Sequence, residues 1–164
     1  MARPGEAPAW VHALLAASGG FLLSTLWFDL MFDGQVYGHP LPLPEPIVAS
    51  IAAYYRRVTT DAHPMQLLVG VAMIVAVVGS LWAARFPGHR LLRWVGLGTC
   101  AMPIGLAMGR VFPNAVLLGQ RSLSLADQSA LARSIFVDHV ICLASIVAFV
   151  CIQVVLARVA SPTD

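Results

Sequence analysis

The stretch MQLLVGVAMIVAVVGSLWAA, residues 65–84, decides the fold class of this chain. It runs for 20 residues without a charged side chain. A helix of about 20 apolar residues is long enough to cross the roughly 30 Å of hydrocarbon in a bilayer. Backbone N–H and C=O groups in lipid must be hydrogen-bonded within the segment, so the stretch predicts a transmembrane helix and not a strand.

Three further apolar runs of similar length lie before and after this stretch. They cover about 11–32, 94–112 and 136–156. The composition agrees, because 59% of the 164 residues are hydrophobic and only 11% are charged, whereas soluble domains average about 25% charged residues. The sequence therefore predicts an all-α fold, an up-down bundle of four transmembrane helices that forms a single integral membrane domain over residues 1–164.

The composition also excludes several classes of protein. The net charge is only +2 and no basic run is interleaved with aromatic residues, so we expect no nucleic-acid partner. Cys100, Cys142 and Cys151 stand in apolar runs without a CxxC spacing, which argues against a zinc knuckle or a redox pair. No cofactor is predicted, and the lipid bilayer is the expected environment.

The topology follows from the number of spans. Four spans put both termini on one side of the membrane, together with the short loop 85–93. Each side carries five arginines, so the positive-inside count is a tie, but short loops influence orientation most strongly. Because Arg85, Arg90 and Arg93 lie in that loop, we predict a bacterial inner-membrane protein with cytoplasmic termini and a cytoplasmic 85–93 loop. The first run is expected to be a retained span, since its small residues precede most of the apolar stretch.

The opposite side carries two long connections, and we call it the loop face. In the first connection, about 33–63, four apolar and aromatic residues recur at helical spacing: Ile47, Ile51, Tyr54 and Tyr55. This spacing predicts an amphipathic helix of about 12 residues that lies in the membrane interface, with the tyrosines at the level of the headgroups.

The second connection, about 113–135, is expected to contain the start of the fourth helix. Ser124 and Asp127 stand three residues apart, which is typical of a capping box at a helix N-terminus. The fourth helix is therefore predicted to begin near Leu125. Its N-terminal part would then extend beyond the membrane before the helix enters the bilayer.

Polar side chains gather at the ends of the spans on the loop face. Asp29 lies inside the first apolar run, where an ionisable group is expensive and by default indicates a functional site. A non-functional interpretation stays open, because charges at helix ends often form exposed salt bridges that contribute little. The side chains predicted at this one level are Asp29, Asp33, His63, Arg110, Asn114, Asp138 and His139.

The residue types in this cluster fit general acid-base chemistry. His139 is the candidate base, since imidazole exchanges protons near neutral pH. Asp138 belongs to the candidate catalytic set, but neighbouring residues point about 100° apart on a helix, so Asp29 or Asp33 is the better partner for His139. Arginine and asparagine side chains could hold the oxygen of a small hydrophobic aromatic substrate. The expected substrate-binding residues are Arg110, Asn114, Tyr55 and His63.

Two alternative functions stay open from the residues alone. Carboxylates and imidazoles, here those of Asp29, Asp33, His63 and His139, are ligands of iron or zinc, although neither a Glu-x-x-His pair nor an HExxH motif is present. The identity of any metal stays unknown. The other alternative is a non-catalytic membrane subunit, whose loop face docks a protein partner or a second copy of the chain and whose charges are structural.

The pattern also resembles a known family. The segments YYRRVTTDAHPM (54–65), FPNAVLLG (112–119) and LARSIFVDHVICLASI (131–146) follow one another across the last three spans. Their arrangement is similar to that of the small four-helix membrane proteins that include the fungal anthrone oxygenases. The matching positions are Pro64, Pro113, Asn114 and His139.

The resemblance implies a reaction as well as a fold. It implies cofactor-independent oxygenation of an electron-rich polycyclic phenol, with His139 as the base. The chain departs from the family where a tryptophan precedes and an arginine follows that histidine, since Ile135 and Cys142 stand there. The pair Asp29 and Asp33 has no counterpart in the family pattern. Likeness of fold alone does not transfer function.

Overall fold

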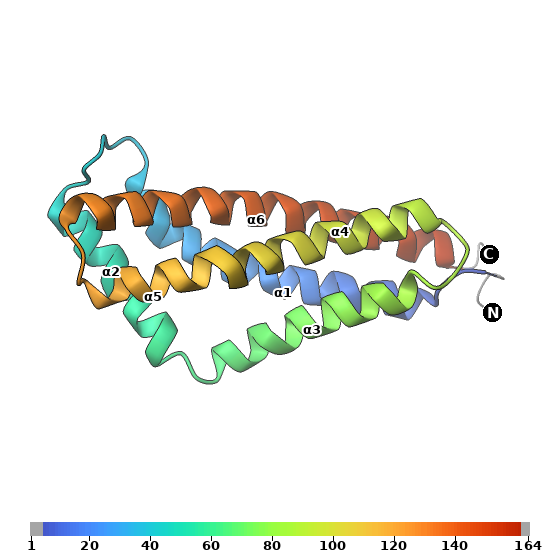
Figure 1. Cartoon of the computed structure of the whole chain (residues 1–164). Coiled ribbons are helices and arrows are strands. Elements are labelled where there is room, and N and C mark those ends of the chain that lie inside the picture. The colour runs from blue at the N-terminus through green and yellow to red at the C-terminus, as the bar shows by residue number, and fades with distance from the viewer. Residues whose placement is uncertain (1–4, 162–164) are drawn as a thin grey trace.

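The computed structural model describes residues 5–161; residues 1–4 and 162–164, which the predicted domain includes, lie outside this range. Within it the chain is helical and contains no strand. Four helical segments are long and apolar enough to cross a membrane, which confirms the predicted all-α membrane class (Figure 1). These segments are Ala9–Val36, Met65–Ala83, Arg90–Gln120 and Leu125–Ala160.

The long helices run beside one another, and the loop face lies at one end of them. Figure 1 shows α6 alongside α1 and α4, with α3 on the far side of α1. Helices α2 and α5 lie at the end that holds the start of α6, and the connection from α3 to α4 lies at the opposite end. The elements in order are α1 (Ala9–Asp33), a 3-10 turn (Gly34–Val36), α2 (Glu45–Thr60), α3 (Met65–Ala83), α4 (Arg90–Leu106), a π-helical segment (Ala107–Val111), α5 (Phe112–Gln120) and α6 (Leu125–Ala160).

The fourth helix begins where the sequence predicts. Helix α6 starts at Leu125, and the Ser124 hydroxyl accepts a hydrogen bond from the backbone N–H of Asp127. At 1.5 Å per residue, its 36 residues extend about 54 Å, whereas the 19 residues of α3 extend only about 28 Å. Bilayer hydrocarbon is about 30 Å thick, so α6 is longer than a span requires. Its N-terminal part extends past the start of α3 on the loop face (Figure 1).

The helix of the third span extends beyond its predicted end near residue 112, so the connection to the fourth helix is shorter than expected. The chain stays helical from Arg90 through the π-helical segment to Gln120, and only the short segment between Gln120 and Leu125 connects it to α6. Pro113 does not end the helix, because it occupies the first turn of α5, where a missing N–H leaves no hydrogen bond unmade. The widened turn Ala107–Val111 accommodates the passage from α4 to α5, as single π turns inside longer helices do.

The helix predicted after the first span is present and is longer than expected. Helix α2 has 16 residues, and it packs against α5 with a buried face that includes Ile51 and Tyr55. The hydroxyls of Tyr54 and Tyr55 point inward from this helix, to carboxylates of α1. The physical reason is that a buried carboxylate needs a hydrogen-bond donor, and tyrosine can supply one from an apolar helix face.

The close contact between α2 and α5 depends on a glycine. A Cβ atom added to Gly119 would lie 3.0 Å from the backbone nitrogen of Arg56. Backbone atoms in a packed helix pair can give way only by moving the whole helix. A side chain at this position would therefore push α2 away from α5.

We expect Gly119→Val to destabilise the protein by about 1–3 kcal/mol, the usual cost of overpacking. The measurement is the thermal unfolding temperature of the detergent-purified protein, followed by loss of helical circular dichroism. Gly98→Val is the matched control, because nothing lies within 4 Å of a Cβ atom there. Equal unfolding temperatures for the two variants would contradict the role given to Gly119.

The end opposite the loop face contains a second buried polar group. His12, which the sequence does not place in the candidate site, is fully buried. Its Nδ1 lies 2.8 Å from Oε1 of Gln153 on α6, and the nearby Arg93 forms an ion pair with Glu6. A polar residue inside an apolar run is tolerated here because another helix supplies its partner.

Candidate functional site

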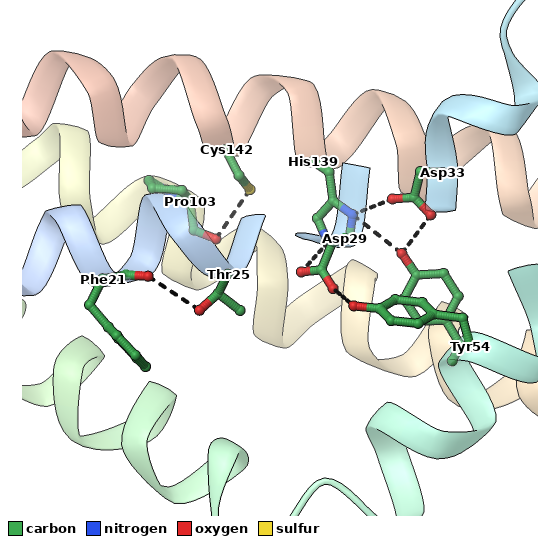
Figure 2. A network of polar contacts seen from close by, with 9 residues as sticks. Phe21, Thr25, Asp29, Asp33, Tyr54, Pro103, His139 and Cys142 are labelled. Atoms are coloured by element: carbon green, nitrogen blue, oxygen red, sulfur yellow. Dashed lines mark hydrogen bonds and ion pairs between the residues drawn. The ribbon is translucent and has the colours of Figure 1, made fainter. Parts of the chain in front are cut away.

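His139 on α6 is the centre of a buried polar network. Its Nδ1 lies 2.6 Å from Oδ2 of Asp33, and its Nε2 lies 3.9 Å from Oδ2 of Asp29. Each carboxylate also accepts a hydrogen bond from a tyrosine: Tyr55 donates to Asp33 at 2.7 Å and Tyr54 donates to Asp29 at 2.6 Å. Figure 2 shows the two carboxylates, on successive turns of α1, on either side of the imidazole ring (Figure 2).

Three helices bring these groups together. Asp29 and Asp33 are four residues apart near the end of α1, so both lie on one face of that helix. Helix α6 packs along α1 and turns His139 toward this face. Helix α2 then covers the pair from the loop face, where the ring of Tyr54 stacks on Phe32 with a centroid distance of 4.0 Å.

The inner half of the network is sealed from solvent. Asp33 is 0% exposed and His139 is 5% exposed. Isolated charges in such surroundings are costly, and they persist when hydrogen bonds compensate them. Burial first, and then the neighbouring carboxylates, raise the pKa of the Tyr54 and Tyr55 hydroxyls. Both tyrosines therefore remain protonated donors to Asp29 and Asp33.

The contact with Asp33 bears on the proton of the imidazole. An ionised carboxylate can only accept, so with Asp33 ionised the short contact from His139 requires a proton on Nδ1. The other ring nitrogen, Nε2, is then free to accept a proton in the neutral ring. Its 3.9 Å separation from Asp29 is too long for a hydrogen bond. His139 thus has one nitrogen held by Asp33 and one nitrogen open to its surroundings.

An apolar cavity of about 180 Å³ is lined in part by His139. It is formed between α1, α2, α3, α6 and the continuous helix from α4 to α5. Its polar wall includes Asp29, Tyr55 and His139, and the remaining lining is mostly aliphatic, with Met73 from α3 and Ala107 from the π-helical segment. The cavity is smaller than the roughly 300 Å³ typical of the smallest ligand pockets, so it suits a compact apolar molecule.

Arg110 and Asp138 form a separate pair. Arg110 Nη2 lies 3.4 Å from Oδ2 of Asp138 and donates a hydrogen bond to Ser134 at 3.1 Å. The Arg110 side chain is 58% exposed, whereas that of Asp138 is buried. Neither residue lines the cavity. Asp138 thus points away from the network around His139, as the 100° offset between neighbouring helical residues requires.

The remaining predicted residues lie apart from the cavity. Asn114 is half-buried on α5, and His63 is exposed in the turn before α3; neither lines the cavity. Of the predicted substrate-binding residues, only Tyr55 contributes to its wall. The structure therefore joins His139, Asp29, Asp33 and Tyr55 into one site. Arg110, Asn114 and His63, which were predicted to bind the substrate, do not line the cavity of this site.

One member of the network was missing from the predicted site. Tyr54 donates to Asp29, but the sequence suggests a position among the headgroups. A signal was present, because Tyr55 shares the apolar helix face of Ile51 and a buried tyrosine hydroxyl normally has a hydrogen-bond partner. Two adjacent tyrosines beside a span with two buried acids therefore point to tyrosine–carboxylate contacts.

Metal binding finds no geometric support in residues 5–161. No group of three or more His, Cys, Asp or Glu side chains in this range is arranged to hold a metal ion. The closest atoms of His139 and Asp33 are hydrogen-bonded to each other at 2.6 Å, so neither is directed at a shared ion. His63, the fourth predicted ligand, does not line the cavity beside His139.

Comparisons of the chain with protein-family models, with curated proteins and with solved structures gave no match. The resemblance to the anthrone oxygenases therefore stays a prediction. The chemistry of the site follows from its own residues: a histidine that has one nitrogen hydrogen-bonded to a buried carboxylate and that lines an apolar cavity.

Proposed function

We propose that this chain is a membrane enzyme in which His139 acts as a general base on a small hydrophobic substrate. The observation that carries the proposal is the setting of the imidazole, whose Nδ1 is bound to Asp33 while the residue forms part of the cavity wall. A carboxylate that holds one nitrogen fixes the tautomer in which the other can accept a proton. The substrate would be a phenol or a carbon acid that partitions into the bilayer.

Each residue of the network has a distinct part in the proposed proton transfer. Nε2 of His139 takes the proton of the substrate, and the positive imidazolium that forms lies between two carboxylates. Asp33 and Asp29 stabilise this charge in surroundings of low dielectric constant, where such stabilisation is strong. Tyr55 and Tyr54 hold the carboxylates in position and are not themselves proton carriers, because their hydroxyls stay protonated.

The resemblance adds a reaction to this proton transfer. Removing a proton from an anthrone-like ring system gives an electron-rich anion that dioxygen can oxidise. One oxygen atom then becomes the new ketone oxygen at the ring carbon, and the other leaves as water with the two hydrogens of that carbon. The aliphatic cavity wall would exclude bulk water from the anion. This oxygenation is the specific activity that we propose to test.

The test is the oxidation of anthrone by the detergent-purified protein. If the protein oxidises anthrone, we expect one dioxygen to be consumed for each anthraquinone formed. The rate should exceed that of spontaneous oxidation in detergent alone. A heat-denatured sample gives the background rate of that spontaneous reaction. An identical rate in the native and denatured samples would reject anthrone as a substrate.

A variant inside the cavity tests whether the substrate binds there. We expect Ala107→Leu, which fills part of the 180 Å³ space, to raise the KM for anthrone about tenfold, a cost of about 1.4 kcal/mol. Gly105→Leu is the matched control, because no atom lies within 4 Å of a Cβ atom at that position and it is not part of the cavity wall. Equal KM values in the two variants would show that the substrate binds elsewhere.

The non-catalytic alternative predicts a different outcome. A docking subunit would co-purify with a partner protein, or with a second copy, in a fixed ratio. Tyr54 and Tyr55 lie on the loop face that such a subunit would use, but their hydroxyls bind the carboxylates of α1. This inward orientation favours the enzyme over the docking subunit. The location that we propose, a bacterial inner membrane with cytoplasmic termini, is the same for both.

A further inference from the structure

A second hollow, which we call the arginine groove, lies between α2 and α5 on the loop face. It has a volume of about 410 Å³. Four small residues line it: Ala49, Ala52, Ala53 and Gly119. The charged residues along it are Arg56, Arg57, Asp61 and Arg121. A hollow lined by small residues and three guanidinium groups is suited to an anion.

The positive charge of this groove is only partly neutralised. Arg121 forms an ion pair with Glu45. Neither Arg56 nor Arg57 takes part in an ion pair within the described part of the chain. Asp61 is the single acid that lines the groove itself. Two guanidinium groups thus have donors available for a ligand.

The groove lies close to the membrane surface. Asp61 stands four residues before Met65, where the transmembrane helix α3 begins. The side-chain amide of Gln66 donates to the backbone oxygen of Val58 at 2.6 Å, which ties the first turn of α3 to the end of α2. Because α3 is only about as long as the hydrocarbon layer is thick, its start marks the boundary of that layer. The groove is therefore near the level of the lipid headgroups.

We propose that the arginine groove binds the phosphate of an anionic phospholipid headgroup. Guanidinium groups bind phosphate oxygens in a bidentate manner, and basic pockets beside transmembrane helices are suited to anionic headgroups. A volume of about 410 Å³ lies within the range of small-molecule sites, so it has room for a phosphodiester and its polar substituent. The bound lipid would hold α2 against α5, and this binding does not depend on the chemistry at His139.

The experiment measures lipid retention and thermal stability in detergent. Native mass spectrometry with dioleoyl-phosphatidylglycerol should show a bound lipid on the wild-type chain, with at least tenfold weaker binding in R56Q/R57Q. The same lipid should raise the unfolding temperature of the wild type, because a ligand that binds the folded state stabilises it. Dioleoyl-phosphatidylcholine, which carries no net charge, should do neither.

The matched control is R85Q/R90Q, which removes two exposed arginines at the opposite end of the molecule and should retain phosphatidylglycerol as the wild type does. If R56Q/R57Q does not fold, R56K/R57K keeps the charge without the bidentate geometry, and an intermediate affinity is expected. Equal retention of phosphatidylglycerol by the wild type and R56Q/R57Q would overturn the proposal, as would equal losses in R56Q/R57Q and R85Q/R90Q. If glycerol 3-phosphate stabilised the wild type as much as the lipid does, the ligand would be a soluble phosphate ester, and the lipid assignment would be wrong.

Discussion

Replacing His139 with glutamine is expected to lower the turnover of anthrone by about 10²–10⁴-fold, the usual contribution of a general base. Glutamine has a similar size and polarity, but it cannot take up a proton at neutral pH. The loss should appear in kcat, since the cavity wall is otherwise unchanged. Dioxygen uptake by the detergent-purified variant is the measurement, with circular dichroism to establish that the helices are intact.

The control for this variant is another histidine of the same chain. His39 is an exposed residue in the segment before α2, and His39→Gln should leave turnover unchanged. A His139→Gln protein that is folded and keeps wild-type turnover would rule out the proposed base. Loss of turnover in both variants to the same degree would indicate a general effect on the protein.

Asp33→Asn is expected to lower kcat by a similar factor, but for a different reason. Asp33 accepts from both His139 Nδ1 and the Tyr55 hydroxyl, whereas an amide offers one acceptor oxygen and one N–H₂ donor. If the amide N–H₂ faces the ring, Nδ1 must become the acceptor and the proton moves to Nε2. The tautomer that can act as a base is then lost, and a change of this kind in a carboxylate–histidine pair can cost about 10⁴-fold in kcat.

Measuring KM as well as kcat distinguishes the loss of His139 orientation from a general loss of protein stability. We expect Asp33→Asn to lower kcat with little change in KM, because Asp33 does not line the cavity. Tyr55→Phe removes one donor and leaves the Asp33–His139 contact in place, so its kcat should fall less than that of Asp33→Asn. A larger loss of kcat in Tyr55→Phe than in Asp33→Asn would contradict the assignment of Asp33 as the residue that orients His139.

The membrane class and the site's central residues could be predicted from the sequence. Asp29 and Asp33 drew attention because an acid within an apolar run needs a partner, and His139 was among the few residues able to provide one. The exclusion of an Asp138–His139 hydrogen bond was also correct, since helical geometry alone separates neighbouring side chains. Arg110 is bound to Asp138 instead, which no sequence spacing indicated.

The sequence by itself determined the spans and the start of α6, because lipid permits only internally hydrogen-bonded segments and the Ser124 cap acts within one turn. Only the tertiary structure decided which polar groups meet. Successive residues on a helix point about 100° apart, so the way α1 packs against α6 decides which side chain meets His139. Here that side chain is Asp33. The same packing leaves α2 to cover the carboxylates of α1, so the hydroxyls of Tyr54 and Tyr55 point into the protein.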